Sequence, residues 1–127
     1  MTWTEEELAA IGAADELRVA PYRPDGSRRD EVIIWAVRSG DEIFVRTAYR
    51  PESAWYRRAV ESGRVRIRAG GVDCDATVVQ VGADADADHD AIDAAYHAKY
   101  DRYGAAYVDP VVGDEVRELT LRLDRAE

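Results

Sequence analysis

The segment 38–71 constrains the fold more strongly than any other part of this chain. Its sequence is RSGDEIFVRTAYRPESAWYRRAVESGRVRIRAGG. Apolar and polar residues alternate over 64–68, which is the period of a β-strand, and a strand over 42–48 would place Ile43, Val45 and Thr47 on one face. Between the two segments, Pro51 suits the first position of a helix and Gly63 suits its end. The segment therefore predicts a strand, a corner rich in Arg and aromatic residues, a short helix and a second strand.

The remaining patterns add more strands and few helices. A capping box at Thr4 and Glu7 predicts a helix over 4–14. The other predicted elements are strands over 17–22, 31–39, 72–81 and 115–124, a helix over 88–103 and a loop over 105–113. The strands follow one another through turns, without the alternation of strands and helices that marks parallel sheets. The pattern favours one domain, residues 1–127, that is mainly β: a six-stranded antiparallel barrel with flanking helices.

One predicted strand is apolar on both faces. Residues 32–37 read VIIWAV, the longest uninterrupted apolar run in the chain. Such a strand is expected in the middle of a structure, either in a barrel wall covered by a helix or in a dimer interface. We therefore expect a homodimer.

Charge and composition exclude several classes of function. The 127 residues carry a formal charge of −9, which opposes binding to the phosphates of nucleic acids. No apolar run is long enough to cross a membrane. The N-terminal residues lack the pattern of a secretory signal, and Cys74 is the only cysteine. These features lead us to expect a cytoplasmic protein that contacts neither nucleic acid nor membrane.

Basic residues are concentrated in one part of this acidic chain. Residues 38–68 contain eight Arg and four acidic residues, so the segment carries a formal charge of +4. Arg binds phosphate and carboxylate groups in a bidentate manner, and helix N-termini also favour anions. Tyr and Trp between the Arg residues offer flat surfaces for stacking. An anionic, flat ligand is one interpretation; an internal network of salt bridges, with the aromatic residues in the core, is an equally weighted alternative.

The same residues carry a family resemblance. The segment 32–72, with IDAAYHAKYDRYG and a terminal TLRL strand, resembles an uncharacterised bacterial family of about this length. That family is similar to the flavin-binding split β-barrels, which include pyridoxamine-phosphate-oxidase-like proteins and deazaflavin-dependent nitroreductases. The match to this wider superfamily covers residues 16–81 and includes the motif WYRRAVESGRVRIRAGG, residues 55–71. The resemblance implies a six-stranded antiparallel split β-barrel that binds FMN or the deazaflavin coenzyme at a homodimer interface.

The resemblance also implies which residues hold the cofactor. They lie at the end of the second hairpin strand, in the following helix and on the next strand. By position, Arg46 and Thr47 would lie near the ring and phosphate, and Arg50, Arg57 and Arg58 would contact the phosphate or tail. Trp55 would be a wall residue, and Arg66 and Arg68 would be contacts from the next strand. Trp35 would be a second wall residue.

Three other constellations have weaker functional interpretations. Asp84, Asp86 and Asp88 are spaced like a calcium loop but lack its Gly and Glu, so acids at a helix start are favoured. His89, Asp93 and His97 would share one helical face, a geometry that can hold a metal, but no further ligand accompanies them and we predict no metal site. Cys74 is in phase with apolar residues and is expected to be a buried structural thiol.

Three functions remain open at this stage. The first is a flavin- or deazaflavin-dependent oxidoreductase that transfers a hydride to a small organic molecule, with catalytic residues that the sequence does not identify. The second is a non-enzymatic barrel that binds a flavin, heme or another anionic ligand. The third is a structural dimer whose Arg residues form only salt bridges.

Overall fold

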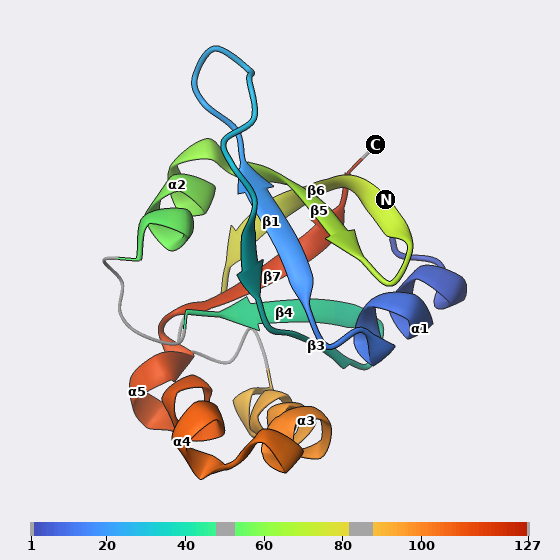
Figure 1. Cartoon of the computed structure of the whole chain (residues 1–127), viewed down its shortest axis with the longest axis vertical. Coiled ribbons are helices and arrows are strands. Elements are labelled where there is room, and N and C mark those ends of the chain that lie inside the picture. Colours follow the sequence, from blue (N-terminus) through green and yellow to red (C-terminus); the bar gives the residue numbers. More distant parts are fainter. Residues whose placement is uncertain (1, 48–52, 82–87, 127) are drawn as a thin grey trace.

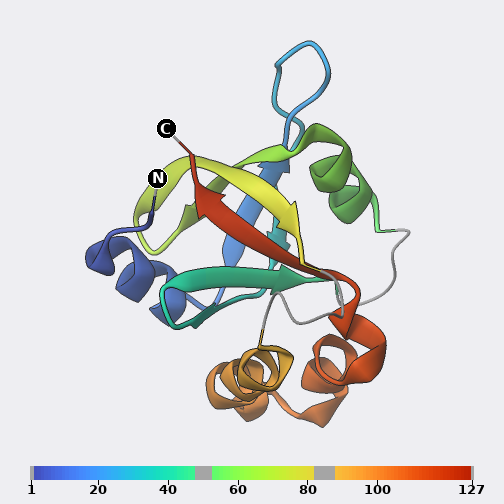
Figure 2. The same ribbon diagram turned by 180° about the vertical axis from the view of Figure 1, so that it is seen from behind.

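One antiparallel sheet forms the body of the protein. The computed structural model describes residues 2–47, 53–81 and 88–126. The seven strands lie in the order β2-β1-β5-β6-β7-β4-β3, and every neighbouring pair is antiparallel. Their bounds are β1 Leu17–Pro21, β2 Val32–Ile34, β3 Ala36–Ser39, β4 Glu42–Arg46, β5 Arg64–Ala69, β6 Val72–Gln80 and β7 Thr120–Arg125. The sheet curls into a nearly closed barrel flanked by helices (Figure 1; Figure 2).

The two edges of the sheet are consecutive in the chain. β2 pairs with β1, whereas β3 pairs with β4 at the other end of the strand order. A single straight strand cannot pair at both ends, so the chain bends at Trp35 and the predicted strand over 31–39 becomes two. This division raises the number of strands from the predicted six to seven, and it leaves the split in the barrel between β2 and β3.

The apolar run 32–37 is not buried on both faces, which corrects the prediction. Val32 and Ile33 are 39% and 48% exposed, whereas Ala36 and Val37 are buried. The reason is that α1 (Glu5–Ala13) and α3 (His89–Tyr100) pack against β3, whereas the main contacts of β2 are with β1 alone. The exposed residues of β2 face a groove described below.

The apolar residues form two clusters on opposite faces of the sheet. The first fills the barrel, with Val19, Val65, Ile67 and Leu121 among its fully buried members. The second lies between the outer face of β3 and β4 and the C-terminal helices. Its members include Val37, Phe44, Ile92, Tyr96, Tyr100, Val108 and Val111.

The two N-terminal helices cap the barrel largely as predicted. In α1 (Glu5–Ala13), Thr4 and Glu7 form the capping box: the Thr4 hydroxyl accepts from the Glu7 N–H, and the Glu7 carboxylate accepts from the Thr4 N–H. Leu8 and Ile11 bury the inner face of α1. α2 (Ala54–Ser62) ends at Gly63, whose φ of 71° is left-handed, as the sequence predicted. Pro51, the predicted first helical residue, lies outside the described residues.

The C-terminal part is more helical than predicted. α3 (His89–Tyr100) continues into a 3-10 turn (Asp101–Tyr103), consistent with the predicted helix over 88–103. The predicted loop over 105–113 instead contains α4 (Ala105–Val108) and a second 3-10 turn (Asp109–Val111). The predicted strand over 115–124 begins late, because α5 (Asp114–Arg117) precedes β7. These turns bury Val108, Val111 and Val116, which a loop would have left in solvent.

Candidate functional site

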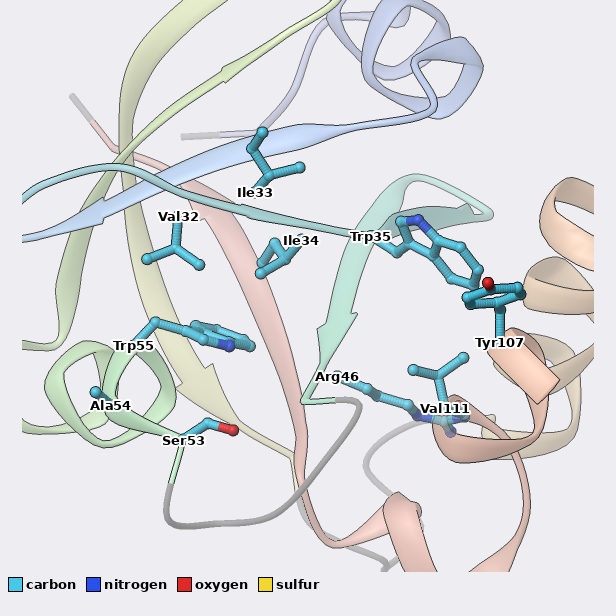
Figure 3. Close-up of a pocket in the computed structure, with 10 residues that line it drawn as sticks. All are labelled: Val32, Ile33, Ile34, Trp35, Arg46, Ser53, Ala54, Trp55, Tyr107 and Val111. Atoms are coloured by element: carbon cyan, nitrogen blue, oxygen red, sulfur yellow. The ribbon is translucent and has the colours of Figure 1, made fainter. Parts of the chain in front are cut away.

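A groove of about 550 Å³ lies beside the exposed edge of the sheet. It runs between β2 and α2 on one side and the end of β4 with the C-terminal helices on the other (Figure 3). Its lining residues are Val32, Ile33, Ile34, Trp35, Arg46, Ser53, Ala54, Trp55, Tyr107 and Val111. The volume falls in the range of small-molecule sites, and a mostly apolar lining with a few polar groups is typical of them.

Aromatic side chains stand on opposite sides of the groove. Trp55 projects from the first turn of α2 toward Val32 and Ile34 of β2, and Tyr107 of α4 lies across the groove beside Trp35 (Figure 3). Tyr107 is 66% exposed, although it is a large apolar residue. An exposed aromatic residue at the mouth of an apolar groove is a suitable surface for a flat ligand.

Arg46 provides the charged end of the groove. Arg46 is 2% exposed, and four protein groups accept hydrogen bonds from its guanidinium. Nη1 donates to Asp93 Oδ1 (2.5 Å) and to the carbonyl of Val111 (2.8 Å), and Nε donates to Thr120 Oγ1 (2.9 Å). Nη2 donates to His89 Nδ1 (3.2 Å). Since Arg has five N–H donors, one is not used by these four partners.

Asp93 balances the charge of Arg46. Burial opposes ionisation of its carboxyl, but hydrogen bonds from Arg46 and Arg117 outweigh burial and lower the pKa of Asp93. Arg117 Nη2 also contacts Asp90, at 2.7 Å, so two Arg and two Asp side chains form a continuous network. The internal salt-bridge interpretation of the Arg residues therefore describes Arg46 correctly, even though Arg46 also lines the groove.

His89 is part of this network. Because a guanidinium only donates, His89 Nδ1 must accept, and the ring proton is therefore assigned to Nε2. His97 points elsewhere, with its Nδ1 2.8 Å from Asp101. Within the described ranges, no group of three or more potential metal ligands converges. Asp88 caps α3 by accepting from the Ala91 N–H, while Asp84 and Asp86 lie outside the described residues.

The structure separates the residues that the resemblance brought together. Arg46 and Trp55 line the groove. Thr47 is buried, with its hydroxyl 2.7 Å from that of Ser53, a groove residue. Arg50 lies outside the described residues. Arg57 and Arg58 line a different cleft on α2.

Arg66 and Arg68 of β5 lie outside the groove lining. Arg66 is paired with Asp73 and Asp75 of β6, and Arg68 is paired with Glu31 through two hydrogen bonds of 2.7 Å. Both residues thus form ion pairs on the surface of the strand.

Several groove residues were not anticipated as site residues. Val32 and Ile33 belong to the apolar run that the sequence pattern placed in the interior, and Tyr107 lies in the segment expected to be a loop. The available signal was the aromatic residue within an otherwise small-sided segment, AAYVDP. Cys74, by contrast, is buried as expected, and burial raises the pKa of its thiol.

The barrel, its split edge and the groove beside it define the class to which this protein belongs by fold: the split β-barrels. A heme storage protein from Vibrio cholerae, HutZ, has a TM-score of 0.61 at 14% identity, with 100% of this chain and 92% of that chain covered. An F420 reductase has a TM-score of 0.54 at 12% identity, with 98% and 97% covered. A FAD and heme binding protein from Mycobacterium smegmatis has a TM-score of 0.50 at 18% identity, with 99% and 67% covered.

The chain belongs to the family described as an uncharacterized protein conserved in bacteria (DUF2255), whose model matches residues 7–123. No curated protein sequence matches it significantly. The identities to the solved structures are low, so these likenesses establish the fold and leave the ligand to be argued from the groove. None of the helices in the described ranges is both long and apolar enough to span a membrane.

Proposed function

We propose that this protein binds a flavin-type cofactor, FMN or the deazaflavin coenzyme, in the groove between β2 and α2. The groove itself carries the proposal: it is apolar, of suitable volume, walled by Trp55 and Tyr107, and charged at one end by Arg46. The fold likeness to proteins named for F420, FAD and heme supports it.

The lining residues fit the ring system of such a cofactor better than they fit its phosphate. Trp55, Ile34 and Tyr107 would hold a flat ring and exclude water from it. Arg46 would offer its remaining N–H to an oxygen or nitrogen atom of the ring or tail. The chemistry that a bound flavin supplies is hydride transfer, here to a small organic acceptor.

A homodimer is part of the proposal. β2 is an edge strand with unpaired backbone groups, and its exposed Val32 and Ile33 lie beside the groove with Tyr107. Natural proteins rarely leave such an edge uncovered. A second copy placed over β2 would bury these residues and close one side of the groove.

Binding without turnover is the second candidate. The described lining residues include no carboxylate, imidazole or thiol, so the phenol of Tyr107 is the one common proton-transferring group among them. A flavin reductase can draw its proton from water, whereas a storage or carrier protein needs no proton donor. This observation favours a carrier, and the experiment below distinguishes it from an enzyme.

The test is a visible absorption spectrum of the purified protein, followed by fluorescence titration with FMN and with the deazaflavin coenzyme. We expect saturable binding that Trp55→Ala weakens by roughly 1–3 kcal/mol, the range for stacking on an aromatic residue. Tyr22→Ala, at a half-buried aromatic residue outside the groove lining, should leave the affinity unchanged. A protein that binds neither coenzyme contradicts the proposal, and a Soret band would redirect it to heme. Oxidation of the reduced, bound cofactor by added acceptors then separates an enzyme from a carrier.

A further inference from the structure

A second cleft, of about 410 Å³, lies on the other side of α2. It is lined by Arg29, Tyr56, Arg57, Arg58, Val60 and Glu61. Arg29 belongs to the connection between β1 and β2, whose base lies beside α2 in both views (Figure 1; Figure 2). The cleft is therefore formed between this connection and the flank of the helix.

Two Arg residues of this cleft, Arg29 and Arg58, differ from most others in the chain. Nine Arg residues are paired with carboxylates: Arg38, Arg46, Arg64, Arg66, Arg68, Arg102, Arg117, Arg122 and Arg125. For Arg29 and Arg58, no side-chain hydrogen bond or ion pair is formed with any residue in the described ranges. In a chain with nine more negative than positive charges, two such guanidinium groups at one cleft call for a physical reason.

Arg29 supplies a second, independent observation. Its Nε atom is buried and has no hydrogen-bond partner among the described residues. A buried donor without an acceptor destabilises the folded state, and a charged donor does so more strongly. An anion in the cleft would supply the missing acceptor.

The cleft is separate from the groove. The two share no lining residue. Successive residues of an α-helix are rotated by about 100°, so Trp55 and Arg57 point about 160° apart around α2. Arg58 is about 60° from Trp55, so the separation rests on the distinct lining residues and is tested by the FMN and riboflavin titration described below.

The formal charges define the kind of anion. Three Arg and one Glu give the lining a net charge of +2. A phosphate monoester carries about −1.5 to −2 at pH 7, whereas a carboxylate carries −1. Tyr56 and Val60 add an apolar wall, suited to an organic group attached to the phosphate.

We infer that this cleft is a binding site for a small phosphomonoester, with Arg29 and Arg58 contacting the phosphoryl oxygens and Tyr56 and Val60 the organic part. Arg57 lines the same cleft. The inference does not rest on the proposed function of the groove.

The experiment is isothermal titration of the full chain, in phosphate-free buffer at fixed ionic strength, with phenyl phosphate, inorganic phosphate and benzoate. We expect saturable binding in the order phenyl phosphate, phosphate, benzoate. Arg29→Gln and Arg58→Gln should each weaken phenyl phosphate about tenfold or more, the effect of losing a charged hydrogen bond. Glu61→Gln should strengthen it, because it removes the one negative charge. Arg28→Gln, which makes the same change in net charge at an exposed residue outside the cleft, should have little effect.

Three results would overturn the inference: no saturable binding of phenyl phosphate, binding that both Arg variants leave unchanged, or equal loss in Arg28→Gln. Near-UV circular dichroism tests whether the variants are folded. Arg58→Gln is expected to perturb the fold less than Arg29→Gln, because Arg58 lies on the exposed face of α2.

A parallel titration with FMN and riboflavin separates this site from the groove. If Arg29→Gln weakens FMN but not riboflavin, the cleft holds the phosphate of the cofactor and the inference of a separate site is wrong. If Trp55→Ala abolishes flavin binding and leaves phenyl phosphate unchanged, the two sites are distinct. If no flavin binds but phenyl phosphate does, the proposed function fails and the phosphomonoester site stands.

Discussion

The indole of Trp35 stacks on the ring of Tyr100, with centroids 3.9 Å apart and planes within 4° of parallel. Trp35 sits where the chain leaves β2 for β3, and Tyr100 ends α3. The Tyr100 hydroxyl accepts from the Ala36 N–H (3.3 Å) and lies 2.8 Å from the carbonyl of Asp15, to which it donates. This pair thus fixes the bend that divides one predicted strand between the two edges of the sheet.

Tyr100→Phe should destabilise the fold by about 1–3 kcal/mol, because it leaves the buried Ala36 N–H without that acceptor. Tyr103→Phe is the matched control: it also removes a hydroxyl bonded to Asp15, but an exposed one. We expect its effect to be under about 1 kcal/mol. Urea denaturation monitored by tryptophan fluorescence measures both, and equal effects would show that the bend does not depend on Tyr100.

Arg46→Met should destabilise the protein by about 3–5 kcal/mol, because it leaves the half-buried Asp93 carboxylate without its main partner. Arg68→Met breaks a bidentate but half-exposed pair with Glu31 and should cost about 1 kcal/mol or less. Both residues were predicted to bind the cofactor. If Arg46→Met unfolds at the same denaturant concentration as Arg68→Met, Arg46 does not stabilise the fold more than a surface ion pair does, and a role in ligand binding is favoured instead.

Lys99 should titrate far below an ordinary lysine. Burial is the main cause that lowers its pKa to about 8, although its Nζ donates to the carbonyl of Ala36 at 2.6 Å. The unfolded chain keeps a pKa of about 10.4, so between about pH 8 and 10.4 the unfolded state binds more protons and stability rises with pH.

Lys99→Met should remove that rise. Since Lys99 is the only lysine, labelling with [15N]lysine gives one Nζ resonance whose titration reports the pKa directly. A midpoint near 10.4 would contradict the prediction.

Gly70→Ala should be more destabilising than Gly71→Ala, although both glycines form the turn between β5 and β6 with positive φ, 57° and 88°. A Cβ at Gly71 meets no atom within 4 Å, so that variant reports left-handed strain alone, about 1–2 kcal/mol. A Cβ at Gly70 would clash with the carbonyl oxygen of Ala10 in α1. We expect roughly 1–3 kcal/mol more, measured by thermal or urea unfolding. Equal losses would mean that α1 moves away without cost.

Local patterns predicted those elements whose residues determine them locally. The capping box at Thr4 and Glu7 and the left-handed end of α2 at Gly63 depend on contacts within a few residues, and both are present as predicted. The short turns at 105–117 were missed, because their helical form depends on burying Val108 and Val111 against α3 and the sheet. No local period signals such a contact.

The candidate site was only partly visible in the sequence for the same reason. The excess of Arg near residues 38–68 was real, but its members divide among a buried network at Arg46, a cleft at Arg58 and strand-surface pairs at Arg66 and Arg68. Which Arg meets which carboxylate depends on strand register and helix rotation, since a carboxylate must lie within about 4 Å to pair.

The sequence by itself determined the antiparallel barrel, because strand alternation and turn residues are properties of consecutive positions. Only the tertiary structure decided that residues 32–34 become an exposed edge. An apolar run has the same pattern in an interior strand and beside a groove, and burial depends on what the rest of the chain places against it.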